Sequence, residues 1–182
     1  GYFSEGGNAA VFKWSFPSDS VSATTSAPSN MGLHAGFANP AVAGYFSKGM
    51  GETAVYKWSF PSDAVSTATS APAQMSHHAG FANPAVAGYF SRGQNQIQIY
   101  RWSFPSDAVA TYAFFITDNM YDHAGFANPG VAGYFSQGNY STQIFKWNFP
   151  QDYFMSPFNA PADLGDHAGF ADPAVAGYFS QG

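Results

Sequence analysis

The chain has 182 residues, of which 9% are charged and 19% aromatic, and its formal net charge is −5. It has no cysteine, which excludes disulfides and thiolate metal sites, and no apolar run approaches the roughly 20 residues of a membrane helix, so we expect no membrane insertion. It also lacks the clustered Lys and Arg that nucleic-acid binding requires, so we expect no nucleic-acid partner. The many rings must therefore be buried or contact something else.

One motif, His-Ala-Gly-Phe-Ala-Asn-Pro-Ala-Val-Ala-Gly-Tyr-Phe-Ser-x-Gly, recurs through the whole chain, and its second half also forms the first residues. Its central glycine stands at Gly1, Gly44, Gly88, Gly133 and Gly177. A period of about 44 residues is typical of solenoids, propellers and arrays. We therefore interpret residues 1–182 as a single repeat domain. The repeats are 1–43, 44–87, 88–132 and 133–176, with 177–182 as a surplus or ring-closing strand.

The first repeat predicts four short strands and no helix. Residues 11–16 alternate aromatic and polar side chains, which is the period of a strand, and Pro17 ends that strand. Residues 20–26 are rich in Ser, Thr and Val and are expected to form an exposed strand. Residues 34–38 and 42–47 are expected to form two strands of mostly small residues.

The small residues indicate how these strands are arranged. Ala-Gly pairs recur where backbones must approach closely, as they do in the innermost strands around the axis of a propeller. The rings of the alternating strands would then fill the space between blades. The predicted fold is an all-β tandem-repeat β-propeller with about four blades of four short antiparallel strands.

Two families resemble this pattern. The order Ala-Gly-Tyr-Phe-x-x-Gly, a hydrophobic-Lys-aromatic-x-Phe strand, Ser-Asp and a further Ala-Gly resembles the kelch-like propeller repeats of bacterial and bacteriophage proteins, including tail and fibre proteins. The usual double glycine of kelch blades is found once, at Gly6-Gly7. A weaker resemblance is to hemopexin-like four-bladed propellers. Both resemblances imply a propeller, and neither implies an active site.

Four histidines occupy equivalent positions in the repeats. They are His34, His78, His123 and His167. In a closed ring they would form a fourfold set of imidazoles, which are common ligands of zinc, copper or nickel. The favoured interpretation is that each imidazole instead hydrogen-bonds a neighbouring strand or loop. No cofactor is expected, although an ion on the central axis is the alternative for these residues.

A basic residue and an aspartate recur six residues apart in every repeat. The pairs are Lys13/Asp19, Lys57/Asp63, Arg101/Asp107 and Lys146/Asp152. We interpret each pair as a salt bridge at a blade edge, or its Asp as a turn cap, rather than as catalytic groups.

The third and fourth repeats differ from the first two in their outer segment, where Ser, Thr and Ala give way to rings. We expect these extra rings to form an interaction surface, because exposed apolar patches mark binding sites. The candidates are Tyr112, Phe114, Phe115, Tyr121, Tyr153, Phe154 and Phe158.

Together these features favour a non-enzymatic binding or structural module on an extracellular or virion surface, recognising a glycan or a protein. The alternative is a self-assembling structural protein that forms fibres by head-to-tail strand pairing, since the chain carries a fifth Gly-Tyr-Phe-Ser segment. An enzyme is not expected, because no nucleophile elbow, phosphate loop or metalloprotease motif is present.

Overall fold

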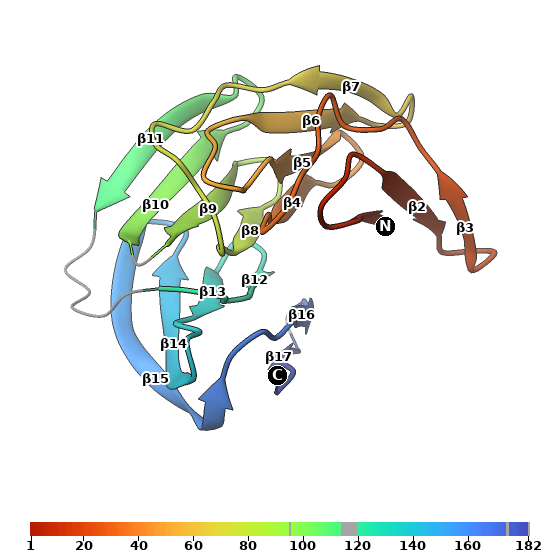
Figure 1. Ribbon diagram of the computed structural model, residues 1–182. Helices are drawn as coiled ribbons and strands as arrows, with labels where there is room; N and C mark the ends of the chain where they lie inside the picture. Colours follow the sequence, from red (N-terminus) through yellow and green to blue (C-terminus); the bar gives the residue numbers. More distant parts are fainter. Residues whose placement is uncertain (95, 114–119, 174, 182) are drawn as a thin grey trace.

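The computed structural model describes residues 1–94, 96–113, 120–173 and 175–181, and it contains strands and turns only (Figure 1). Four small antiparallel sheets stand around a common centre as a four-bladed β-propeller, which confirms the predicted fold class, and a two-stranded hairpin follows the fourth sheet. The described residues include no helix with the length and apolar character of a membrane span.

The first two blades differ by one strand. The first blade consists of β1 (Tyr2–Ser4), β2 (Val11–Ser15) and β3 (Ser20–Ala23). The second blade consists of β4 (Gly36–Asn39), β5 (Ala43–Ser47), β6 (Val55–Ser59) and β7 (Ala64–Thr67). The first blade therefore lacks the innermost strand that the second has in β4.

The third and fourth blades again have four strands. The third consists of β8 (Gly80–Asn83), β9 (Ala87–Gly93), β10 (Gln96–Ser103) and β11 (Ala108–Ala113). The fourth consists of β12 (Gly125–Asn128), β13 (Ala132–Ser136), β14 (Ser141–Asn148) and β15 (Tyr153–Leu164). The terminal hairpin consists of β16 (Gly169–Asp172) and β17 (Ala176–Phe179).

The second, third and fourth blades each cross a repeat boundary. The innermost strand of each comes from the His-Ala-Gly-Phe-Ala-Asn half of the motif, and the Ala-Gly-Tyr-Phe-Ser half follows after a tight turn. The first blade begins with that second half, and the terminal hairpin consists of the two motif halves alone.

The small residues lie in the innermost strands of the blades, as the sequence predicted. Strands β4, β8, β12 and β16 lie side by side along the inside of the propeller. Gly80 approaches the carbonyl of Gly36 so closely that a Cβ atom at position 80 would overlap it. Any side chain at position 80 would therefore force the two inner strands apart.

Three hydrophobic clusters form the core, and each joins two consecutive blades. The first contains Val11 with Trp58, the second contains Phe37 with Trp102, and the third contains Phe81 with Trp147. We expected the rings of the alternating strands to fill the space between blades, and these clusters confirm it.

Candidate functional site

The contact between neighbouring blades is built from one ring and one glycine. Phe37 of β4 packs over Gly88 of β9, so that a Cβ atom at position 88 would overlap the ring. The same relation joins Phe81 to Gly133 and Phe126 to Gly177. The innermost strands of the second and third blades thus insert their phenylalanines into spaces left open by glycines of the next blade, and that of the fourth blade does so at the terminal hairpin.

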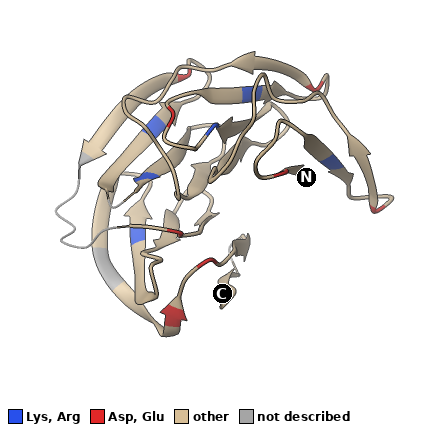
Figure 2. Cartoon of the chain, in the orientation of Figure 1, with Lys and Arg blue, Asp and Glu red and all other residues tan. Residues whose placement is uncertain are grey.

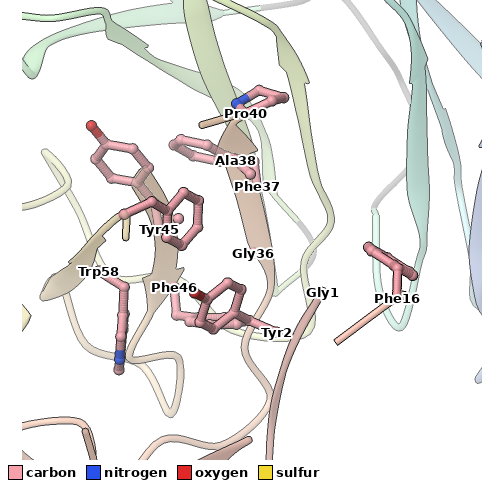
Figure 3. A pocket seen from close by; sticks show the side chains of 12 residues that line it. Gly1, Tyr2, Phe16, Gly36, Phe37, Ala38, Pro40, Tyr45, Phe46 and Trp58 are labelled. Carbon is pink, nitrogen blue, oxygen red and sulfur yellow. The ribbon is translucent and has the colours of Figure 1, made fainter. Parts of the chain in front are cut away.

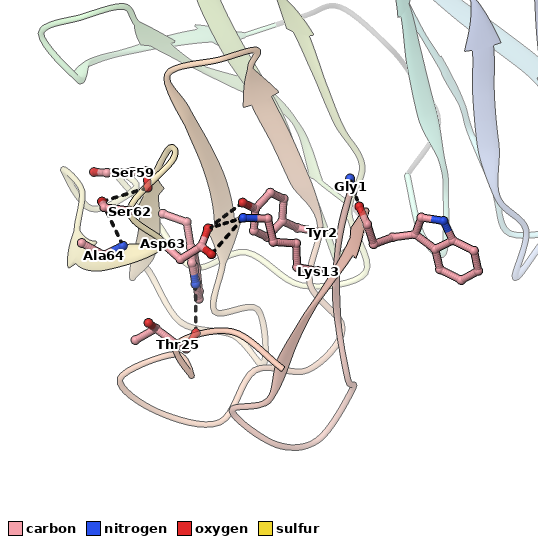
Figure 4. A network of polar contacts seen from close by, with 10 residues as sticks. Gly1, Tyr2, Lys13, Thr25, Ser59, Ser62, Asp63 and Ala64 are labelled. Carbon is pink, nitrogen blue, oxygen red and sulfur yellow. Dashed lines mark hydrogen bonds and ion pairs between the residues drawn. The ribbon is translucent and has the colours of Figure 1, made fainter. Parts of the chain in front are cut away.

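A polar contact joins each pair of consecutive blades, from the first to the fourth. In Figure 4, Lys13 of the first blade forms an ion pair with Asp63 of the second at 3.0 Å, and the Tyr2 hydroxyl donates to the same carboxylate at 2.6 Å. Lys57 pairs with Asp107 at 2.6 Å in the next interface. The interface between the third and fourth blades has the same two contacts. Arg101 forms an ion pair with Asp152 at 3.1 Å, and the Tyr89 hydroxyl donates to the Asp152 carboxylate at 2.7 Å.

The interpretation of these residues as pairs within one repeat was wrong. Lys13, Lys57 and Arg101 each bind the Asp of the next blade instead of the Asp of their own turn. Strand pairing places each of them opposite the motif tyrosine, whose hydroxyl donates to the same carboxylate across the interface. Figure 2 shows how few charged residues the chain carries and how they are spread over the blades.

The equivalent histidines also join consecutive blades. His78 Nε2 lies 2.6 Å from Ser47 Oγ of the preceding blade, and His167 Nε2 lies 2.7 Å from Ser136 Oγ. His34 and His123 make the same bond to Ser4 and Ser91. The hydrogen bonds to a neighbouring strand that we favoured for these residues are therefore present.

Burial keeps two of these imidazoles neutral. Desolvation, with a smaller contribution from neighbouring histidines, lowers the pKa of His78 to about 3, and desolvation likewise lowers the pKa of His123 to about 3. Burial lowers the pKa of His34 and His167 as well. A neutral imidazole can hydrogen-bond a serine hydroxyl without the cost of a buried charge.

A shallow cavity of about 280 Å³ opens beside these histidines and also touches His77 and Asp122. His77 Nδ1 bonds the Asp122 carboxylate, and its ring stacks on Tyr121 with centroids 4.0 Å apart. Among the described residues, no three His, Asp or Glu side chains lie close enough together to hold a metal ion.

The candidate interface rings fall into two environments. Tyr112 and Phe154 pack against the core cluster of the third and fourth blades, and Tyr121 stacks on His77. Tyr153 and Phe158 of β15 are about half exposed. Phe114 and Phe115 lie outside the described residues.

A second cavity, of about 550 Å³, lies between the first and second blades (Figure 3). Gly1 and Tyr2 of β1 form one side of it, and Gly36 and Tyr45 of the second blade form the other. Gly44 lines this cavity. It occupies the position of Gly88 in the next blade but receives no phenylalanine from an inner strand, since the first blade has none.

The sequence analysis placed the motif glycines at close backbone approaches, but it did not identify the phenylalanine that fills the space beside Gly88 and Gly133, or the ion pairs between a basic residue and the Asp of the next blade. The available signal was the recurring order of Phe, Gly, Tyr, Lys or Arg, and Asp, which indicates a repeated contact but not its partner. No protein-family model matches the sequence, and no curated protein matches it significantly.

Proposed function

We propose that the chain is a non-enzymatic recognition module of an extracellular or virion surface, which binds a glycan or a protein through the outer strand of its fourth blade. The observation that carries this proposal is the exposure of two rings on β15. Tyr153 and Phe158 are 46% and 55% exposed. A ring held this way can stack on a sugar face or enter a protein interface.

The strand itself supports the proposal. β15 has 12 residues, whereas the outer strands β3 and β7 have four each and carry only Ser, Ala, Val and Thr. It is an edge strand, because β14 is its only partner within the described sheet. An outer strand that is longer and richer in rings than its equivalents is the part of the scaffold best suited to contact a partner.

The test is a glycan array probed with the wild-type chain and with the double variant Tyr153→Ser/Phe158→Ser. We expect binding that the double variant loses and that Val86→Ser, a change at an exposed apolar residue of the third blade, retains. If no glycan on the array binds the wild type, a protein partner is sought by affinity capture from host surface extracts with the same three proteins. Binding that is equal in the wild type and the double variant would contradict the assignment to β15.

A further inference from the structure

The interface between the third and fourth blades is held at both ends of its inner strands β8 and β12, and the two ends differ chemically. Before the start of β12, His123 bonds the third blade, and past the end of β12 the Gly130 N–H donates to Asn83 Oδ1 at 2.9 Å. We call these contacts the histidine end and the asparagine end. Of the two, the histidine end contains a group whose charge can change near neutral pH.

The hydrogen bonds at the histidine end require a neutral imidazole. The Ala79 N–H donates to His123 Nε2 at 3.2 Å, and the Ser91 hydroxyl contacts the same nitrogen. A backbone N–H can only donate, so Nε2 must carry a lone pair, and the proton of the neutral ring is on Nδ1. A second proton, on Nε2, would remove this acceptor and bring two N–H donors face to face.

The surroundings of His123 do not favour that second proton. The residue is 6% exposed, and among the described residues no carboxylate hydrogen-bonds its ring. Burial, with a smaller contribution from His167, lowers its pKa to about 3. The nearby Asp122 carboxylate already bonds His77. The titratable groups around His123 and along the cavity that it lines are His34, His77, His78, His167, Asp122 and Asp166.

The rest of the interface has no such requirement. At the asparagine end an amide oxygen accepts from a backbone N–H, and the same contact joins the second and third blades, where the Ala85 N–H donates to Asn39 Oδ1 at 3.0 Å. Between the two ends, Phe81 packs over Gly133, which is an apolar contact. The charged groups of this interface, Arg101 and Asp152, form an ion pair with each other. Loss of the histidine contact therefore leaves the other contacts in place.

We propose that mild acid opens the histidine end of this interface while the asparagine end and the ring contact stay closed. The imidazole takes up its second proton when the start of β12 moves away from β8 and water reaches the ring. The interface is thus a pH-sensitive hinge whose fixed point is the bond between Gly130 and Asn83. Opening widens the shallow cavity of about 280 Å³ beside the histidines. This inference does not depend on the recognition surface on β15.

The experiment measures hydrogen–deuterium exchange of two amides by NMR at pH 7 and pH 5, corrected for intrinsic exchange rates. The Ala79 N–H reports the histidine end. We expect its opening equilibrium to rise about twentyfold from pH 7 to pH 5, because an open imidazole with an ordinary pKa of about 6.5 takes up a proton over this range. The Ala79 N–H also bonds Ser91 Oγ, but a serine hydroxyl does not titrate, so the ratio is unaffected.

The Gly130 N–H reports the asparagine end in the same sample. Gly130 lies in an exposed turn, so its N–H exchanges through local opening and not through global unfolding. We expect its opening equilibrium to change less than about twofold between the two pH values.

Two variants identify the group that responds to pH. His123→Gln keeps an amide oxygen that can accept from the Ala79 N–H but cannot take up a proton, so the rise at Ala79 should disappear. His77→Gln makes the same change in the neighbouring histidine, which bonds Asp122 instead of a serine, and the rise at Ala79 should remain.

The comparison of Ala79 with Gly130 in the wild type tests the hinge even where a variant does not fold. An equal rise at both amides would show that the whole interface separates at once. No rise at Ala79, or the same rise in His123→Gln, would show that His123 is not the pH-sensitive contact. Each of these results would overturn the proposal.

Discussion

Phe37 of the second blade occupies the space in which any side chain at Gly88 of the third blade would lie. This relationship recurs at two further interfaces and fixes how closely consecutive blades approach each other. The stability of the propeller therefore depends on this contact.

The first prediction compares one substitution at two equivalent glycines. Gly88→Ala should destabilise the chain by about 1–3 kcal/mol, because its methyl group overlaps the buried Phe37 ring. Gly44→Ala should change the free energy of unfolding by less than about 1 kcal/mol, since a Cβ there meets only Phe60 at 3.2 Å. Urea unfolding in dilute solution measures both. Equal losses at the two positions would mean that the ring–glycine contact does not set the blade spacing.

The second prediction concerns the ion pairs between blades. The side chains of Lys57 and Asp107 are 22% and 17% exposed and lie 2.6 Å apart, so Asp107→Asn should cost about 1 kcal/mol. Asp19→Asn should cost less than about 0.5 kcal/mol in dilute solution, because Asp19 has no basic partner among the described residues of its own chain. Asparagine tolerates the positive φ of both positions, so the comparison isolates the ion pair.

The third prediction follows from the buried histidines. Burial lowers the pKa of His78 and His123 from 6.5 to about 3, so between these values the unfolded chain binds more protons than the folded chain. Stability should therefore be lost as the pH falls below 6.5, by about 1.4 kcal/mol per pH unit for each histidine.

Unfolding in urea between about pH 5 and pH 7 measures this slope, in a range where carboxylates with ordinary pKa values stay ionised. The variant His78→Gln keeps a polar group near Ser47 and should lose the share of the slope that His78 contributes. The same slope in the variant and the wild type would show that His78 does not remain neutral in the fold.

Much of the fold could be predicted from the sequence, because the repeat imposes its period on every element. The alternation of rings around Trp58 predicted a strand, and the Ala-Gly pairs predicted the innermost strands, which the structure contains at Gly36 and Gly80. These features are local, since one repeat carries the pattern that one blade needs.

Contacts between repeats could not be predicted in the same way. Lys57 has an aspartate six residues away in its own repeat and another in the next, and only the geometry of the sheet decides in favour of Asp107. The environments of the extra rings also depend on packing, since Phe154 points into the core whereas Phe158 on the same strand is exposed.

The most direct test of the account traps the interface between the third and fourth blades with a disulfide, which is clean because the native chain has no cysteine. A Cβ at Gly125 would lie 3.3 Å from that of Ala79, close to disulfide spacing. The variant Ala79→Cys/Gly125→Cys therefore brings two thiols together when the inner strands β8 and β12 lie side by side. Ala79→Cys alone is the control that cannot cross-link within one chain.

The measurement is the number of free thiols in the oxidised double variant after denaturation, together with its size on non-reducing electrophoresis. We predict a single-chain species without free thiols, in which reducing agent restores both thiols. Free thiols in the oxidised double variant, or cross-links only between separate chains, would contradict the packing of the inner strands of consecutive blades against one another.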